Sequence, residues 1–113
     1  MTLLEALTQF AYECNHNDRL QAMNRDWTRR IQLDPDDTHL PHYIISDSGQ
    51  LSVGAGAVDN PDLLITSSEE ILTAVFSGQM TPTEPYNAGD LMVKGRQDDV
   101  MRLDILTLLI WGE

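Results

Sequence analysis

The sequence predicts an α+β fold, in which a mostly antiparallel sheet carries helices on one face. Two observations support this fold class. Apolar residues recur at three-to-four spacing near both ends of the chain, which indicates amphipathic helices. Between these segments, short apolar runs are separated by clusters of Asp, Asn, Gly and Pro, which indicates strands and turns. Because the chain has 113 residues, it can bury one core, and we expect a single domain over residues 1–113.

The first half of the chain is predicted to form a helix followed by several strands. Residues 2–16 have one apolar face, and Thr2 with Glu5 three residues later has the pattern of a capping box. A second short helix is expected over residues 19–24. Strands separated by turns are then predicted at residues 27–33, 42–46, 51–58 and 62–66.

The second half begins with the clearest helix-start signal in the chain. Ser67 precedes Glu70 by three residues, as in a capping box, and an apolar helix follows. Residues 81–86 contain two prolines and are predicted to form a loop. We expect a strand over residues 89–93 and a last helix that begins at residue 97.

The charge of the chain is strongly negative. Asp and Glu total 18 against 7 Lys and Arg, which gives a net charge of −11, and residues 31–93 contain no Lys or Arg. Nucleic acids and anionic membranes are bound through cationic side chains, so this charge argues against nucleic-acid binding and stable membrane anchoring. A single cysteine, with neither a signal-peptide pattern nor a long apolar run, favours a cytoplasmic location.

The sequence offers no convincing catalytic or metal-binding set. His39 and His42 could bind a metal together with a nearby Asp, but Pro41 disfavours helical spacing, and a polar loop entering a strand explains the pair better. Cys14 lies on the apolar face of the first helix, where core packing is favoured over a nucleophilic role. We therefore expect that the protein is not an enzyme and uses neither a cofactor nor a metal ion.

The last helix is apolar nearly all round. From residue 100 to residue 111, Arg102, Asp104 and Thr107 are the residues that interrupt its apolar character. In a small domain, such a helix buries both faces, dimerises or covers a ligand cavity. Nearby methionines suit a surface that accepts varied apolar ligands, although an ordinary core accounts for them equally well.

A pattern spread over residues 59–106 resembles a known family. It consists of the short strand at residues 62–66 with the acidic helix start behind it, the Gly-x-Leu-x-Val-x-Gly strand at residues 89–95, and the last helix at residues 100–106. In order and spacing, these pieces are similar to the SCP2 sterol-carrier domain family. The resemblance implies a sheet of about five mostly antiparallel strands, covered by helices on one face, with an apolar tunnel between sheet and helices.

The resemblance also implies which residues form the wall of the tunnel. They lie on the middle helix, the following strand and the last helix, and are Leu72, Val75, Phe76, Met80, Met92, Leu103, Leu106 and Ile110. The sequence departs from the family at one position, because Asp90 stands where members commonly have a cation.

Members of this family bind fatty acyl chains, sterols or other lipids without a cofactor or metal. The resemblance therefore implies noncatalytic binding or carrying of a lipid or another apolar small molecule, of fatty acyl, sterol-like or quinone-like chemistry. The alternative is an interaction module of the same fold, in which the apolar last helix packs against a second copy, as a homodimer, or against an enzyme partner.

Overall fold

The computed structural model describes residues 1–111, and it contains helices and strands in an α+β arrangement. Within the described residues, the helices are α1 (Leu3–Asn15), α2 (Asp18–Asn24), α3 (Glu69–Phe76), α4 (Thr83–Ala88) and α5 (Gln97–Trp111). The strands are β1 (Arg29–Pro35), β2 (His42–Asp47), β3 (Gln50–Ala55), β4 (Leu63–Ser67) and β5 (Met92–Gly95). The predicted α+β fold class is confirmed.

The strands form one sheet in the order β3-β2-β1-β4-β5. Antiparallel pairing joins β1 to β2, β2 to β3 and β4 to β5, whereas β1 and β4 run parallel. The sheet is therefore mostly antiparallel, as predicted, with one parallel pair at its centre. Ile31 of β1 pairs with Ile44 on one side and with Leu63 on the other, so three buried side chains lie in one row.

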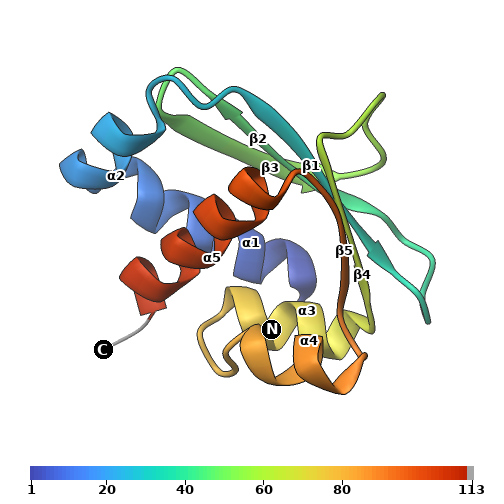
Figure 1. The fold of residues 1–113 in the computed structure, drawn as a ribbon. Coiled ribbons are helices and arrows are strands. Elements are labelled where there is room, and N and C mark those ends of the chain that lie inside the picture. Colours follow the sequence, from blue (N-terminus) through green and yellow to red (C-terminus); the bar gives the residue numbers. More distant parts are fainter. Residues whose placement is uncertain (112–113) are drawn as a thin grey trace.

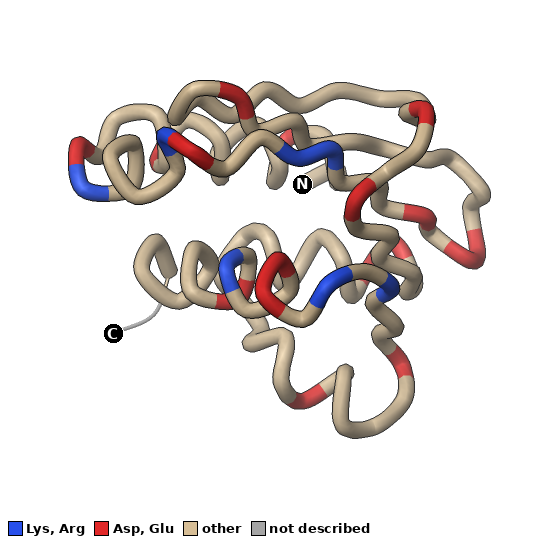
Figure 2. The backbone as a smooth tube through the Cα atoms, turned by 45° about the horizontal axis from the view of Figure 1, so that its top comes forward, with Lys and Arg blue, Asp and Glu red and all other residues tan. Residues whose placement is uncertain are grey.

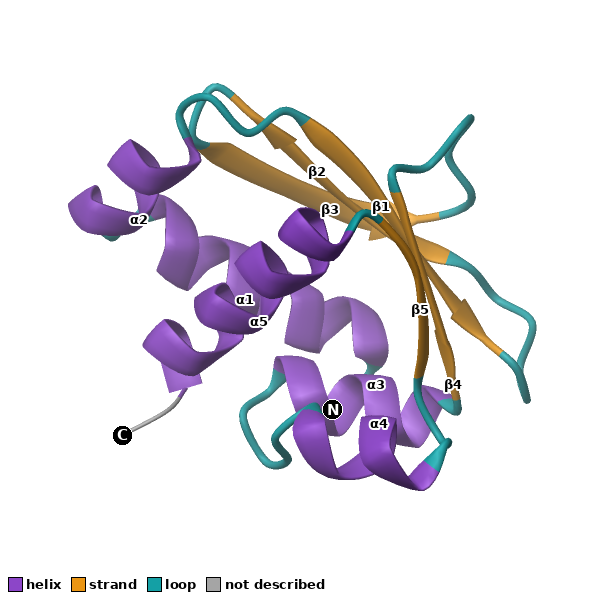
Figure 3. Cartoon of the chain, in the orientation of Figure 1, coloured by secondary structure: helices purple, strands orange, loops and turns teal. Residues whose placement is uncertain are grey.

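The helices lie on one side of the sheet (Figures 1 and 3). Alternate residues of the central strands face them and are buried, because successive side chains of a strand point to opposite faces. In β1 and β4 these buried residues include Ile31, Leu33, Leu63 and Ile65. The rings of Phe10 in α1 and Phe76 in α3 meet edge to face at 5.3 Å between centroids, which joins two helices inside the core.

The first helix begins as its sequence predicts. The Thr2 side chain accepts a hydrogen bond from the Glu5 amide, and the Glu5 carboxylate accepts one from the Thr2 amide, which completes the capping box. Cys14 is buried on the inner face of α1, and burial raises the pKa of its thiol to about 12. The thiol therefore stays protonated at neutral pH, which agrees with a packing role.

The predicted cap of α3 is wrong by one residue. Ser68 is the residue whose side chain accepts a hydrogen bond from the Ile71 amide. Ser67 instead ends β4, is buried, and donates through Oγ to the backbone oxygen of Asp90 at 2.6 Å. The strand continues one residue further than predicted because Ser67 pairs with Pro35 of the neighbouring strand.

The loop predicted over residues 81–86 is wrong in part, because the helix α4 begins at Thr83 and extends to Ala88. Pro82 precedes α4 and Pro85 lies in its first turn, where the missing amide and the fixed φ of proline are tolerated. Gly89 ends α4 in the left-handed conformation, with φ of +83°. The strand predicted over residues 89–93 therefore begins later, at Met92, and extends to Gly95.

His39 lies in the loop that leads into β2, and His42 is the first residue of that strand. His42 is mostly buried, and its Nδ1 lies 2.8 Å from the backbone oxygen of Leu40. His39 has a positive φ of +58°, as expected in a turn. Among residues 1–111, the structure contains no group of three or more His, Cys, Asp or Glu side chains placed to hold a metal ion.

Candidate functional site

Two adjoining cavities lie between α5 and the segment from α3 to α4. Their volumes are about 210 and 250 Å³. Both are lined by residues of α3, the α3–α4 segment and α5, and the residues common to both are Val75, Pro82, Thr83, Asp104 and Thr107. The two cavities therefore form one continuous depression, which we call the α5 groove.

The sheet and α3 supply the inner wall of the groove. Ile65 of β4 and Val93 of β5 line the first cavity and are partners in the antiparallel register, so both side chains point toward the helices. Val75 and Phe76, at the end of α3, close the wall from the other side. Aliphatic and aromatic side chains thus meet at one end of the core, where β5 is the edge strand.

The outer wall is one face of α5. Its lining residues recur at the spacing of a helix, at Val100, Asp104, Thr107 and Trp111, with additional contributions from neighbouring positions. Tyr86 of α4 and Met101 of α5 line the first cavity and are more than half exposed. The cavity therefore opens to solvent, and water can enter and leave it.

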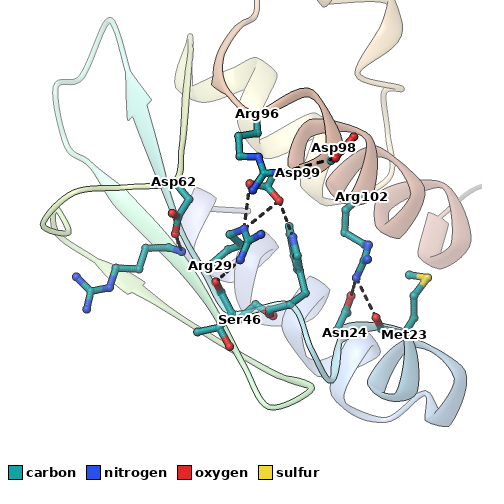
Figure 4. Close-up of polar contacts among 12 residues, drawn as sticks. Met23, Asn24, Arg29, Ser46, Asp62, Arg96, Asp98, Asp99 and Arg102 are labelled. Carbon is teal, nitrogen blue, oxygen red and sulfur yellow. Dashed lines mark hydrogen bonds and ion pairs between the residues drawn. The ribbon is translucent and has the colours of Figure 1, made fainter.

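A buried polar cluster fixes the N-terminal end of α5 to the sheet (Figure 4). Asp99 is 3% exposed, and its Oδ1 accepts a hydrogen bond from Trp27 Nε1 at 2.9 Å. Arg29 Nε lies 3.0 Å from each Asp99 carboxylate oxygen, and this contact is also an ion pair. Burial raises the pKa of Asp99, but the hydrogen bonds from Trp27 and Arg29 and the Arg29 charge outweigh it and lower the pKa overall.

Further contacts hold both ends of α5. Arg102 donates to the backbone oxygen of Met23 at 2.9 Å, and its guanidinium carbon lies 5.4 Å from the centre of the Trp27 ring. At the other end, Trp111 Nε1 donates to the backbone oxygen of Phe76 at 2.9 Å. A side chain on Gly78 would collide with the Trp111 ring, so a glycine lets this indole approach α3. These contacts hold α5 in place over the groove.

A comparison with family models matches residues 5–106 to the SCP-2 sterol transfer family. The chain belongs to this family. The family match and the five-stranded fold confirm the resemblance noted in the sequence. The family consists of lipid-binding and lipid-transfer domains that are generally noncatalytic. A search of curated proteins found no relative similar in sequence.

Solved structures support the fold assignment at low sequence identity. A "UbiJ-SCP2 Ubiquinone synthesis protein" is 13% identical, has a TM-score of 0.75, and aligns over 91% of this chain and 90% of its own. Palmitated SCP2L2 from Aedes aegypti is 17% identical, with a TM-score of 0.67 and 95% coverage of both chains.

A larger protein also contains the fold. The sec-alkylsulfatase Pisa1 from Pseudomonas sp. is 11% identical with a TM-score of 0.64, and it aligns with 80% of this chain but only 14% of its own. This chain therefore corresponds to a small part of that protein. At these identities the structural likeness establishes the shared SCP-2 fold.

The SCP-2 resemblance named eight wall residues, and the structure brings part of that set together. Val75, Phe76 and Leu103 line the first cavity, and Val75 with Met80 lines the second. Leu72 and Leu106 are 0% exposed and pack inside the core. Four of the eight residues therefore line the groove, and two lie in the core beside it.

The remaining two members of the SCP-2 set lie elsewhere. Ile110 packs against the core without lining either cavity, and Met92 is 57% exposed. Met92 precedes Val93, which lines the groove, so the alternation of a strand turns the Met92 side chain to the other face of the sheet. Tyr86 and Ile65 also line the groove, although neither belongs to this set. Tyr86 lies in the helix α4, which was not predicted from the sequence.

Polar residues of the groove were also not anticipated. Asp104, Thr107 and Thr83 line both cavities, although the sequence presents Asp104 and Thr107 as mere interruptions in an apolar helix. Thr107 is mostly buried, and its hydroxyl donates to the backbone oxygen of Asp104 at 2.8 Å. The helical spacing of 104, 107 and 111 is the signal in the sequence that places these residues on one face.

No helix in residues 1–111 combines the length and the apolar character needed to cross a bilayer. The same residues also contain no cluster of His, Cys, Asp and Glu side chains that could hold a metal ion. The groove offers mostly apolar surface of the kind that binds small molecules.

Proposed function

We propose that this SCP-2 family member binds or carries a lipid or another apolar small molecule in the α5 groove, without catalysing a reaction on it. The observation that carries the proposal is the mostly apolar groove, which is open to solvent at Tyr86 and Met101 and built between the sheet and α5. Apolar concave sites with a few polar groups are typical of small-molecule binding sites.

The chemistry of the groove fits a chain-like apolar ligand. Each buried methylene contributes about 0.8 kcal/mol. About ten buried methylenes would contribute roughly 8 kcal/mol, which equals the free energy of a micromolar complex before the cost of association is subtracted. Two similar structures, a ubiquinone synthesis protein and a palmitated SCP2L2, support quinone-like or fatty acyl chemistry for the ligand.

Filling the groove with a side chain tests this proposal. Val100 is partly buried and lines the first cavity, so Val100→Trp is expected to occupy the space needed by the ligand. We expect uptake of a fluorescent fatty acyl probe to fall at least tenfold, measured by titration of delipidated protein. Met92→Trp is the matched control, since Met92 is exposed on the opposite face of the sheet.

The proposal has a clear contrary outcome. It is wrong if delipidated wild-type protein neither binds acyl, sterol and quinone probes nor gains thermal stability with any of them. It is also wrong if Val100→Trp and Met92→Trp bind the probe as tightly as the wild type while remaining folded, because the ligand would then occupy another site.

A second candidate function is self-association through α5. Several apolar side chains of this helix are between 41% and 60% exposed: Ile105 and Leu109, which line neither cavity, and Met101 and Leu108, which also line the groove. Two copies could bury these faces against each other in a two-fold symmetric contact. Leu106 has no part in this surface, because it is fully buried.

Sedimentation distinguishes self-association from ligand binding. If α5 forms a dimer, Leu109→Glu is expected to convert it to a monomer, since Leu109 is 53% exposed, lines neither cavity, and a charge there opposes apolar burial. The dimer should strengthen with added salt, because each copy carries a net charge of −11 and screening weakens their repulsion. A wild-type monomer at all salt concentrations contradicts this second function.

A further inference from the structure

Asp104 is a charged residue in the mostly apolar lining of the α5 groove. It is one of the residues that line both cavities. Among the residues that line the groove in the described part of the chain, it is the one Asp, Glu, Lys or Arg. Asp104 is exposed, and an exposed carboxylate carries a negative charge at neutral pH.

The Lys and Arg side chains near α5 contact other groups or lie away from the groove, and none of them lines it within residues 1–111. Arg29 is paired with Asp99, and Arg102 donates to Met23 and stacks on Trp27 at the far side of the helix. Lys94 follows Val93 in β5, so strand alternation directs it away from the groove face that Val93 lines.

Arg96, the remaining cation near α5, also does not line the groove. Arg96 precedes α5, is largely exposed, and lies 3.9 Å from Asp98. Figure 2 shows that the acidic positions are spread over the whole chain, whereas Lys and Arg occupy a few places. No cation in residues 1–111 lines the groove and neutralises Asp104 there.

We propose that Asp104 makes the groove selective for apolar ligands whose polar end is an uncharged hydroxyl, and against ligands that end in a carboxylate. This inference rests on the proposed function, because it assigns the polar end of the ligand that the groove binds. A hydroxyl donates a hydrogen bond to a carboxylate, and such charge-assisted bonds are stronger than neutral ones. A ligand carboxylate offers no donor and is repelled.

The other polar groups of the groove favour the same ligand. The Thr107 hydroxyl donates to the backbone oxygen of Asp104, so its remaining capacity is to accept hydrogen bonds. Thr81, Thr83, Tyr86 and Gln97 carry groups that can donate or accept, and they do not distinguish the two ligand classes. Asp104 and Thr107 are therefore the groups that discriminate, and both accept from a hydroxyl.

The size of the discrimination follows from simple electrostatics. Two carboxylates about 5 Å apart in bulk water repel each other by an amount equal to about a fourfold change in binding constant. The low-dielectric wall of the groove increases this repulsion, and salt reduces it. We therefore expect Asp104 to weaken binding of a carboxylate ligand by about fivefold or more at low salt.

Two probes of equal chain length test the inference. Hexadecanol and hexadecanoate share the same apolar part and differ at the polar end. With the full chain at low salt and about pH 8, where the fatty acid is ionised, we expect the wild type to bind hexadecanol more tightly. Asp104→Asn should strengthen hexadecanoate binding about fivefold without strengthening hexadecanol binding. Raising the salt to about 0.5 M should reduce this difference.

Asp98→Asn is the matched control. Asp98 lies on the same helix, its side chain is 85% exposed, and it does not line either cavity, so this variant should leave both affinities unchanged. If Asp104→Asn leaves the ratio of the two affinities unchanged, or if Asp98→Asn changes it equally, the inference about Asp104 is overturned while the proposed function stands. If neither probe nor any other apolar ligand binds the wild type, the proposed function itself fails.

Discussion

Replacement of Asp99 by alanine is expected to lower the free energy of unfolding by about 3 kcal/mol. The substitution removes the acceptor of the Trp27 indole and the partner of the mostly buried Arg29 guanidinium. Both donors would remain in place without their acceptor. Urea unfolding measures the loss, which is large for a domain whose total stability is of the order of 5–15 kcal/mol.

A neighbouring carboxylate provides the control for Asp99. Asp98→Ala removes an exposed acidic residue from the same first turn of α5, and we expect a change below about 0.5 kcal/mol. If the two alanine variants lose equal stability, the cluster around Asp99 does not anchor α5.

The contribution of Asp99 should also depend on pH. Its pKa is lowered in the folded protein, so the ionised form is favoured by folding. Its stabilisation is fully present above the ordinary aspartate pKa of about 3.9 and is lost as the pH falls through the lower folded value. The stability difference between the wild type and Asp99→Asn should therefore stay constant from neutral pH to about pH 5 and shrink below about pH 4.

Replacement of Phe76 by alanine is expected to cost about 3–5 kcal/mol. Phe76 is 2% exposed, meets Phe10 edge to face, and also lines the first cavity. Its removal leaves a space between α1 and α3 and takes away the aromatic pair, and the surroundings relax only in part. Thermal or urea unfolding measures the loss.

A smaller substitution at the same site tests the packing argument. Phe76→Leu keeps most of the apolar volume but removes the ring, so its cost should be well below that of Phe76→Ala. Equal losses for both variants, or a loss below about 1 kcal/mol for the alanine variant, would mean that Phe76 is not a central element of the core.

Local patterns in the sequence predict most of the helices and strands. The capping box at Thr2 and the strand β2 follow from signals within a few residues and are found where expected, whereas the strands predicted at 27–33 and 51–58 lie at Arg29–Pro35 and Gln50–Ala55. The capping-box pattern favours Ser67, because Glu70 follows it by three residues, but Ser67 pairs with Pro35 in the sheet and the adjacent Ser68 caps α3 instead. The parallel β1–β4 pair depends on contacts between distant segments, which no local pattern encodes.

The candidate site is less predictable because it depends on which face each residue presents. Val75, Phe76 and Leu103 lie on the groove, whereas the equally apolar Leu72 and Leu106 lie in the core. The pairing of Trp27 with Asp99 joins residues 72 positions apart, and an acidic residue in a first helical turn is ordinarily explained by the helix dipole alone. Tertiary packing, and not residue type, separates these roles.

The strand β5 stands at the edge of the sheet, contains four residues and pairs with β4 alone within the described chain. The opposite edge strand, β3, is longer and packs against α1. Proteins open in cooperative parts, and short edge elements separate at lower free energy than the centre of a sheet. One wall of the α5 groove thus includes a short edge strand. If the groove binds a ligand as proposed, we expect exchange of the ligand to proceed through partial opening at β5, while the hairpin of β2 and β3 keeps its amide hydrogens protected.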